Sequence, residues 1–195
     1  MKNDIILSGV GGQGILSIAA VIGFAAVERN LFLKQSEVHG MSQRGGDVQS
    51  HLRLSDTPVA SDLIPHGHAD LIISVEPMEA LRYLPWLSDK GWIITNSEPF
   101  VNISNYPPAD QILEEIRKIR NNIIIDADKI AKETGSARAG NIVVLGAASP
   151  FISIPYSSLE NGVRKLFGRK GEEIVEMNLL AMKAGRDFAE RNSPK

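Results

Sequence analysis

Three glycines between a strand-like segment and a helix-like segment constrain the fold of this chain more than any other feature. Ile5 to Ser8 has the apolar character of a buried strand, and Ile15 to about Val27 has apolar residues at helical spacing. Between them lies Gly9-Val10-Gly11-Gly12-Gln13-Gly14. Glycines permit a tight turn and let backbone N–H groups approach a phosphate at the positive end of a helix. The segment therefore predicts a strand, a turn and a helix that together begin an α/β fold.

This turn is a candidate anion site, for which we single out Gly9, Gly11, Gly12, Gln13 (through its side-chain amide) and Gly14. The alternative is a tight turn that binds no ligand. A nicotinamide site usually has an acid about 20 residues on, at the end of the second strand. Glu37 lies roughly there, but in a polar loop beyond the short predicted strand Leu31–Leu33, and Lys34 occupies the strand end. The sequence thus disfavours NAD and leaves a phosphate site and an empty turn both open.

A second cluster of polar residues and glycines runs from Gln35 to Asp47. Its candidate binding residues are Ser42, Gln43, Arg44 and Gly45, and Arg44 can pair with a phosphate or a carboxylate. We expect residues 37–46 to lie beside the first glycine turn, because both segments should follow consecutive strands of a parallel sheet. The alternative is a flexible surface loop. Composition alone does not separate these two interpretations.

The rest of the chain alternates between strand-like and helix-like segments. Residues 48–54 alternate as a half-exposed strand does, and residues 71–75 form an apolar run typical of a buried parallel strand. The other predicted strands are 92–95 and 123–125; the predicted helices are 78–87, 111–121, 157–167 and 172–191, with a buried apolar segment at 141–148. We therefore predict one domain, residues 1–195, with a Rossmann-like α/β fold and a largely parallel sheet flanked by helices.

Charge and composition exclude several classes of function. The formal net charge of −2 argues against nucleic acid or a membrane surface as a partner, and no apolar run is long enough to span a bilayer. No signal peptide is visible, so we expect a cytoplasmic protein. The chain has no cysteine, which excludes a cysteine-bound iron–sulfur cluster. If this protein takes part in electron transfer, another chain must carry the electrons.

No catalytic residue and no metal site are predicted. His66 and His68 form a His-x-His pair, but Pro65 and Gly67 suggest a solvated turn and no third ligand is evident. Glu76 could be a carboxylate in the binding crevice, although an acid at a helix N-terminus is the favoured interpretation.

Several segments together resemble one family, the gamma subunits or domains of pyruvate/ketoisovalerate/indolepyruvate:ferredoxin oxidoreductases. The matching segments are residues 9–14, Glu37-Val38-His39-Gly40-Met41-Ser42-Gln43-Arg44-Gly45-Gly46, 69–77 and 141–146. The resemblance extends over essentially the whole chain, and Glu37, His39 and Met41 make it most similar to the small, or beta, subunit of the indolepyruvate type.

The resemblance implies a division of labour between subunits. A larger partner holds thiamine diphosphate and iron–sulfur clusters, decarboxylates a 2-oxoacid oxidatively, passes electrons to ferredoxin and forms an acyl-CoA. This chain then contributes to assembly and to contacts with coenzyme A, and is inactive alone. It lacks both cysteine and a Gly-Asp-Gly motif of the thiamine diphosphate type, as that division requires. An independent nucleotide-binding or NAD-dependent enzyme is the alternative.

Overall fold

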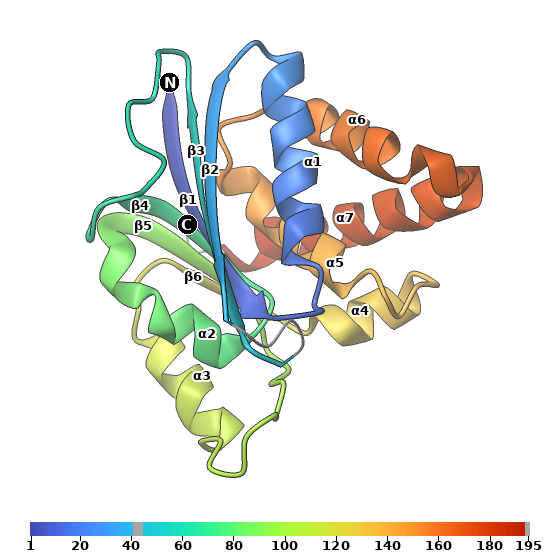
Figure 1. Cartoon of the computed structure of the whole chain (residues 1–195). Helices are drawn as coiled ribbons and strands as arrows, with labels where there is room; N and C mark the ends of the chain where they lie inside the picture. The colour runs from blue at the N-terminus through green and yellow to red at the C-terminus, as the bar shows by residue number, and fades with distance from the viewer. Residues whose placement is uncertain (41–44, 194–195) are drawn as a thin grey trace.

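A single six-stranded sheet with helices on both faces forms the protein in the computed structural model, which describes residues 1–40 and 45–193 (Figure 1). The strand order is β2-β3-β1-β4-β5-β6. The strands are β1 (Lys2–Val10), β2 (Phe32–His39), β3 (Asp47–Ser55), β4 (Ala69–Ser74), β5 (Leu87–Asn96) and β6 (Asn122–Ile125). Strands β1, β4, β5 and β6 pair in parallel, whereas β3 pairs antiparallel with both β1 and β2. The predicted α/β fold is confirmed, and its sheet is mixed.

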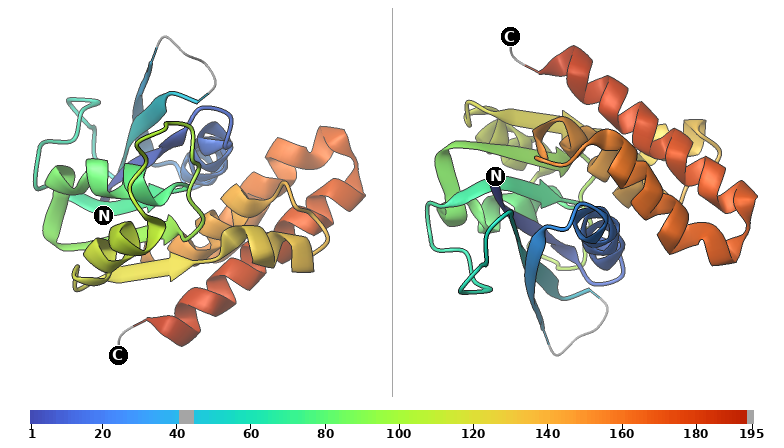
Figure 2. Two further views of the ribbon diagram at one scale, coloured as in Figure 1. Left: turned by 90° about the horizontal axis from the view of Figure 1, so that it is seen from below. Right: turned by 90° about the horizontal axis from the view of Figure 1, so that it is seen from above.

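The helices cover the two faces of the sheet unequally (Figure 2). One face packs against α1, α5 and α7, with α6 packed onto α1 and α7, and we call it the four-helix face. The other packs against α2 and α3, and we call it the two-helix face. The helices are α1 (Ile15–Glu28), α2 (Pro77–Arg82), α3 (Ala109–Arg117), α4 (Ala127–Glu133), α5 (Gly140–Ala148), α6 (Tyr156–Phe167) and α7 (Glu172–Asn192). In the described part of the chain, no helix has the length and apolarity to cross a membrane.

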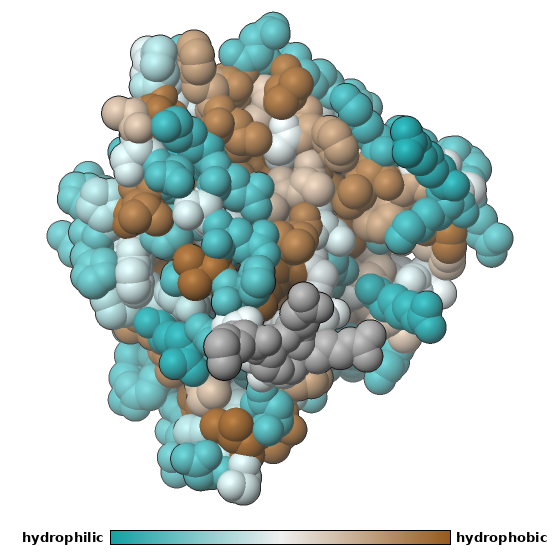
Figure 3. All heavy atoms as spheres, in the orientation of Figure 1, coloured by the Kyte–Doolittle hydropathy of each residue, from teal (hydrophilic) through white to brown (hydrophobic). Residues whose placement is uncertain are grey.

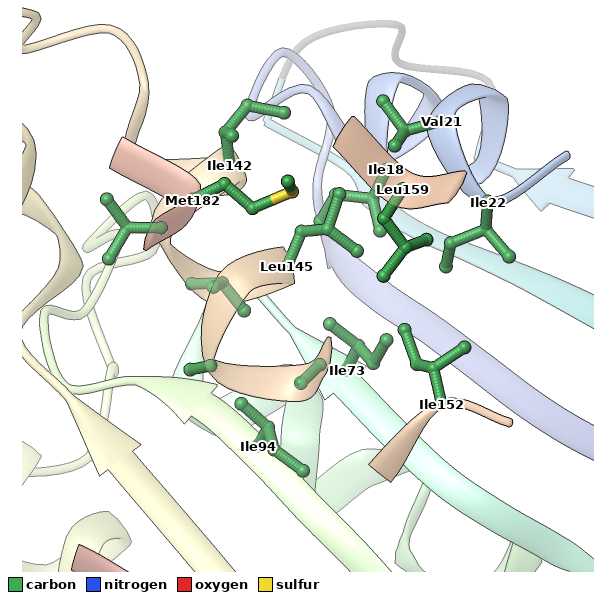
Figure 4. Packing of buried hydrophobic residues seen from close by; sticks show 14 of the residues in the cluster. Ile18, Val21, Ile22, Ile73, Ile94, Ile142, Leu145, Ile152, Leu159 and Met182 are labelled. Atoms are coloured by element: carbon green, nitrogen blue, oxygen red, sulfur yellow. The ribbon is translucent and has the colours of Figure 1, made fainter. Parts of the chain in front are cut away.

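The four-helix face holds the larger core, which Figure 4 shows from close by. Ile18 and Ile22 from α1, Leu145 from α5 and Leu159 from α6 are completely buried there. Helix α5 is apolar around its whole circumference because it lies between the sheet and α7. The predicted burial is therefore confirmed for residues 142–148, whereas Asn141 is half-buried.

Two glycines bring the backbones of α5 and α7 into direct contact. A methyl group added at Gly146 would lie 2.0 Å from the carbonyl oxygen of Met182, and one added at Gly185 would lie 2.0 Å from that of Val143. Real atoms do not approach so closely, so any side chain at either position forces the two helices apart. The spacing of α5 and α7 is therefore set by the absence of side chains.

The second and third strands differ from their predictions. In place of the predicted short strand Leu31–Leu33, β2 extends to His39, so Lys34 and Glu37 lie inside it. The polar loop that was predicted from Gln35 onward is shorter by the same residues. Strand β2 is exposed on most of its length because it is the edge of the sheet, and it therefore has no clear apolar pattern. Strand β3 was predicted to be half-exposed, yet most of it is buried because it lies between β2 and β1.

Candidate functional site

The first glycine turn lies at the end of β1 and leads into α1, as predicted. Gly14 is the residue before the helix and has φ of +81°, a conformation that side chains rarely permit. The side chain of Asn141 donates a hydrogen bond to the Gly14 carbonyl, 2.9 Å from Nδ2 to O. Gln13 accepts a hydrogen bond from the Val10 N–H through Oε1, at 2.8 Å. The Gln13 side chain therefore braces the turn with its oxygen, whereas the sequence suggested an amide free for a ligand.

The N-terminus of α1 has the electrostatics of an anion site. No side chain within the described residues caps this helix, and its first turn contains no acidic residue. The first N–H groups of a helix have no partner inside the helix, and they carry a partial positive charge. The Ser17 N–H donates to the Gly14 carbonyl at 3.0 Å, whereas the N–H groups of Ile15 and Leu16 have no partner among the described residues and are available to a ligand that approaches the turn.

A cleft of about 400 Å³ opens at this helix end. Three glycines of the turn, Gly11, Gly12 and Gly14, form part of its wall, whereas Gly9 and Gln13 do not line it. Strand β2 supplies Glu37 and His39 on the opposite side. The remaining lining is apolar and consists of Val10, Ile15, Leu16 and Val48. The cleft thus combines polar backbone with an apolar wall, as small-molecule sites generally do.

The hairpin between β2 and β3 touches the glycine turn. The Gly11 N–H donates to the Gly46 carbonyl at 2.8 Å, and the Gly45 N–H donates to the Gly11 carbonyl at 3.4 Å. Gly45 and Gly46 therefore lie beside the glycine turn, as we expected for this segment. The expected cause was wrong, because β2 and β1 are not neighbouring parallel strands; β3 lies between them. Two successive antiparallel pairings leave β2 running in the same direction as β1, so both ends meet at one edge. Ser42, Gln43 and Arg44 lie outside the described residues.

A buried carboxylate organises the same edge of the sheet. Glu76 is fully buried and is the N-cap residue of α2, where it accepts a hydrogen bond from the Glu79 N–H at 2.8 Å. It also accepts hydrogen bonds from the Phe100 N–H at 3.3 Å and from the Tyr106 hydroxyl. Burial and the Glu76 carboxylate raise the pKa of Tyr106 well above its ordinary value. The favoured interpretation of Glu76 as a helix N-terminal acid is confirmed, and its carboxylate also holds the loop after β5 at Phe100 and Tyr106.

The geometry is unlike that of a nicotinamide site. Glu37 lines the cleft, but it lies in an edge strand that does not neighbour β1, whereas the dinucleotide fold places its second strand next to the first. His66 packs its ring against Trp86, with 4.1 Å between ring centroids. Within the described residues, no group of three metal-binding side chains is present.

Local sequence patterns did not identify three residues that shape this site. Asn141 holds Gly14 from a helix more than a hundred residues away, and Asn102 donates to the Gly45 carbonyl. Tyr106 anchors the loop to Glu76. An asparagine directly preceding the apolar run 142–148 was the one available signal, because a polar residue at the start of a buried helix needs a partner.

Comparison with known proteins identifies close relatives over the full length. The family described as pyruvate ferredoxin/flavodoxin oxidoreductase matches residues 4–188. Indolepyruvate oxidoreductase subunit IorB of Archaeoglobus fulgidus is 37% identical, and the match covers 100% of this chain and 98% of the relative. The corresponding subunit of Methanothermobacter thermautotrophicus is 34% identical, covering 95% of this chain and 96% of the relative.

Solved structures show the same fold. The 2-oxoglutarate:ferredoxin oxidoreductase of Magnetococcus marinus, solved with 2-oxoglutarate, coenzyme A and succinyl-CoA bound, superposes with a TM-score of 0.78 at 23% identity. That match covers 97% of this chain and 31% of the larger one. The keto/oxoacid ferredoxin oxidoreductase gamma subunit of Geobacter sulfurreducens matches at a TM-score of 0.72 and 22% identity, covering 100% and 99% of the two chains. The family match and the full-length relatives together show that this chain belongs to the pyruvate ferredoxin/flavodoxin oxidoreductase family.

Proposed function

We propose that this chain is the small subunit of an indolepyruvate-type 2-oxoacid:ferredoxin oxidoreductase that works in the cytoplasm. Relatives with 34–37% identity, whose matches cover 79–100% of this chain, are subunits of indolepyruvate oxidoreductases, which supports an arylpyruvate substrate. The absence of cysteine supports a larger partner that holds the iron–sulfur clusters and thiamine diphosphate and passes electrons to ferredoxin. The same relatives leave the alternative, an independent NAD-dependent enzyme, without support.

The cleft at the start of α1 is our candidate contact for coenzyme A, the co-substrate of the reaction. The uncapped helix N-terminus beside Gly11, Gly12 and Gly14 carries this proposal, because its N–H groups and partial positive charge suit a phosphate of coenzyme A. The apolar wall formed by Ile15, Leu16 and Val48 suits the less polar part of the same molecule. Arg44 and its neighbours Ser42, Gln43 and Gly45 are proposed to add phosphate or partner contacts.

Glu37 restricts how an anion can bind. Its carboxylate lines the cleft and repels a phosphate, although it is exposed and therefore well screened by solvent and salt. We propose that a phosphate binds against the glycine turn on the side of the cleft away from β2. Replacing Glu37 with Gln then lowers the KM for coenzyme A slightly.

A single charge placed at Leu16 tests the proposal. Leu16 lines the cleft and is 51% exposed, and it lies in the first turn of α1, where an acid stabilises the helix. Leu16→Glu should therefore fold normally but repel a phosphate. We expect the KM for coenzyme A of the complete enzyme to rise by roughly tenfold, equivalent to about 1.4 kcal/mol, with the KM for the 2-oxoacid unchanged.

The matched control is Leu16→Gln, because Gln has nearly the same shape as Glu but carries no charge. Both variants are assayed as complexes with the catalytic subunit, and the isolated chain, expected to be inactive, serves as the blank. Equal KM values for coenzyme A in the wild type, Leu16→Gln and Leu16→Glu would show that coenzyme A does not bind in this cleft. If the complex nevertheless forms normally, the chain is still a subunit of the enzyme, and only the proposed coenzyme A contact is contradicted.

A further inference from the structure

An apolar patch projects from the loop that follows β5. Phe100, Val101 and Ile103 are 42%, 68% and 44% exposed, and we call these three residues the apolar rim. Figure 3 shows hydrophobic surface at the lower end of the molecule, where Figure 1 draws this loop. Large apolar side chains gathered on one short exposed segment are costly in water and are typical of interaction surfaces.

The rim is held in a defined place. The Phe100 N–H donates a hydrogen bond to the buried Glu76 carboxylate at 3.3 Å, and the Tyr106 hydroxyl donates to the same carboxylate at the other end of the loop. Hydrogen bonds to a charged, buried acceptor are stronger than those between neutral groups. The three apolar side chains are therefore presented outward by an anchored loop, and a partner does not have to order that loop when it binds.

The rim is also joined to the cleft by a chain of hydrogen bonds. Asn102, between Val101 and Ile103, donates to the Gly45 carbonyl in the hairpin. The Gly45 N–H in turn donates to the Gly11 carbonyl in the glycine turn, at 3.4 Å. A partner that binds the rim therefore contacts a loop that is hydrogen-bonded to the hairpin. The hairpin is in turn hydrogen-bonded to Gly11, which forms part of the cleft wall.

We propose that the apolar rim is the docking surface for the catalytic subunit. The proposal rests on the function proposed above, because a coenzyme A cleft in this chain is useful only if the partner's reacting centre lies beside it. The loop that carries the rim lies beside the β2–β3 hairpin and the glycine turn, as the view from below in Figure 2 shows, and the cleft opens at that turn. A partner seated on the rim therefore faces the cleft, and it also covers the exposed apolar surface.

Site-directed crosslinking tests this docking surface in the assembled enzyme. The chain has no cysteine, so Val101→Cys introduces one unique thiol that can carry a benzophenone maleimide. The matched control is Leu180→Cys on α7, because Leu180 is similarly exposed at 54% but lies on the four-helix side. After the labelled complex is irradiated, mass spectrometry identifies the crosslinked peptides.

The expected result is a crosslink from residue 101 to the catalytic subunit and none from residue 180. A complex that forms but crosslinks residue 101 only to a second copy of this chain, or to nothing, overturns the docking proposal and leaves the proposed function standing. If no catalytic subunit joins the complex, both proposals fail.

Polar replacement gives an independent measure. In the double variant Val101→Ser/Ile103→Ser, we expect the Kd of the complex to rise at least tenfold, because buried apolar anchors dominate most interfaces. Leu180→Ser should leave the Kd unchanged. The folded state is checked by thermal unfolding of each variant, and a double variant that folds and binds with the wild-type Kd contradicts the proposal.

Discussion

The two faces of the sheet are held together in different ways. On the four-helix face the buried core is apolar, and α5 and α7 meet backbone to backbone at Gly146 and Gly185. On the two-helix face a smaller apolar cluster is joined at its edge by the buried acids Glu76 and Glu79 and by the hydroxyls of Tyr83 and Tyr106. The stability of the four-helix face depends on the close packing of apolar side chains and helix backbones. The two-helix face depends on polar contacts that position the candidate site.

Gly146→Ala should have the largest effect on stability, since it acts on the face that depends on close packing. The new methyl group would lie 2.0 Å from the Met182 carbonyl oxygen, and no rotation of a side chain can relieve a backbone contact. We expect the free energy of unfolding to fall by about 3 kcal/mol. Urea denaturation measures it.

The control for this change is Gly168→Ala, where the added methyl group meets no atom within 4 Å and the backbone is helical, with φ of −54°. That variant should be as stable as the wild type or slightly more stable. Equal losses for the two alanine variants would show that the α5–α7 contact does not limit the four-helix face.

Tyr106→Phe breaks one polar contact of the other face. The Glu76 carboxylate loses one of its three hydrogen bonds while remaining buried, so the free energy of unfolding should fall by about 2 kcal/mol. Tyr156→Phe is the matched control, because the Tyr156 hydroxyl is buried with no hydrogen-bond partner among the described residues. Its removal should be neutral or stabilising. A loss for Tyr156→Phe as large as that for Tyr106→Phe would mean that the volume filled by a buried hydroxyl, and not the hydrogen bond to Glu76, accounts for the effect at both sites.

The smallest expected effect is a dependence on pH. Burial raises the pKa of Glu79 above its ordinary value of 4.5, although the neighbouring Arg82 opposes the shift. The folded state therefore prefers protonated Glu79, and its stabilising contribution is complete below pH 4.5 and is lost as pH rises through the raised pKa. Each unit of pKa difference corresponds to about 1.4 kcal/mol.

The difference in free energy of unfolding between wild type and Glu79→Gln isolates this contribution. We expect that difference to move against the wild type as pH rises above 4.5, and to do so further in an Arg82→Gln background, where the opposing cation is absent. Urea denaturation at several pH values gives the curve. A difference that moves in favour of the wild type over this range would show that the ion pair with Arg82 outweighs burial.

The sequence predicts well those elements whose pattern is local and strong. Helices α1 and α7 and the buried strand β4 have clear apolar periodicity or continuous apolar runs, and they lie close to their predicted bounds. Strand β2 was mostly missed, because an exposed edge strand rich in polar residues has the composition of a loop. The antiparallel pairing of β2 and β3 was not predicted, because the glycine-rich stretch that joins them was interpreted as a binding or flexible loop and not as a hairpin connection.

The candidate site was predicted only where a motif is contiguous. The glycine turn was located from its own residues, whereas the contacts that hold it come from Asn141 and Asn102, distant in sequence. Glu76 was recognised as a helix N-terminal acid, yet its bonds to Phe100 and Tyr106 span 24 and 30 residues. Such contacts arise from the order of strands in the sheet, which periodicity does not specify.

The close contact of α5 and α7 also has a consequence for synthesis of the protein. A ribosome releases α5 before α7 exists, and α5 is apolar on every side. Until residues near Gly185 emerge, the nascent chain has no partner backbone to lie against Gly146, and one side of α5 remains open to water. During synthesis α5 therefore exposes apolar surface that only α7 later covers.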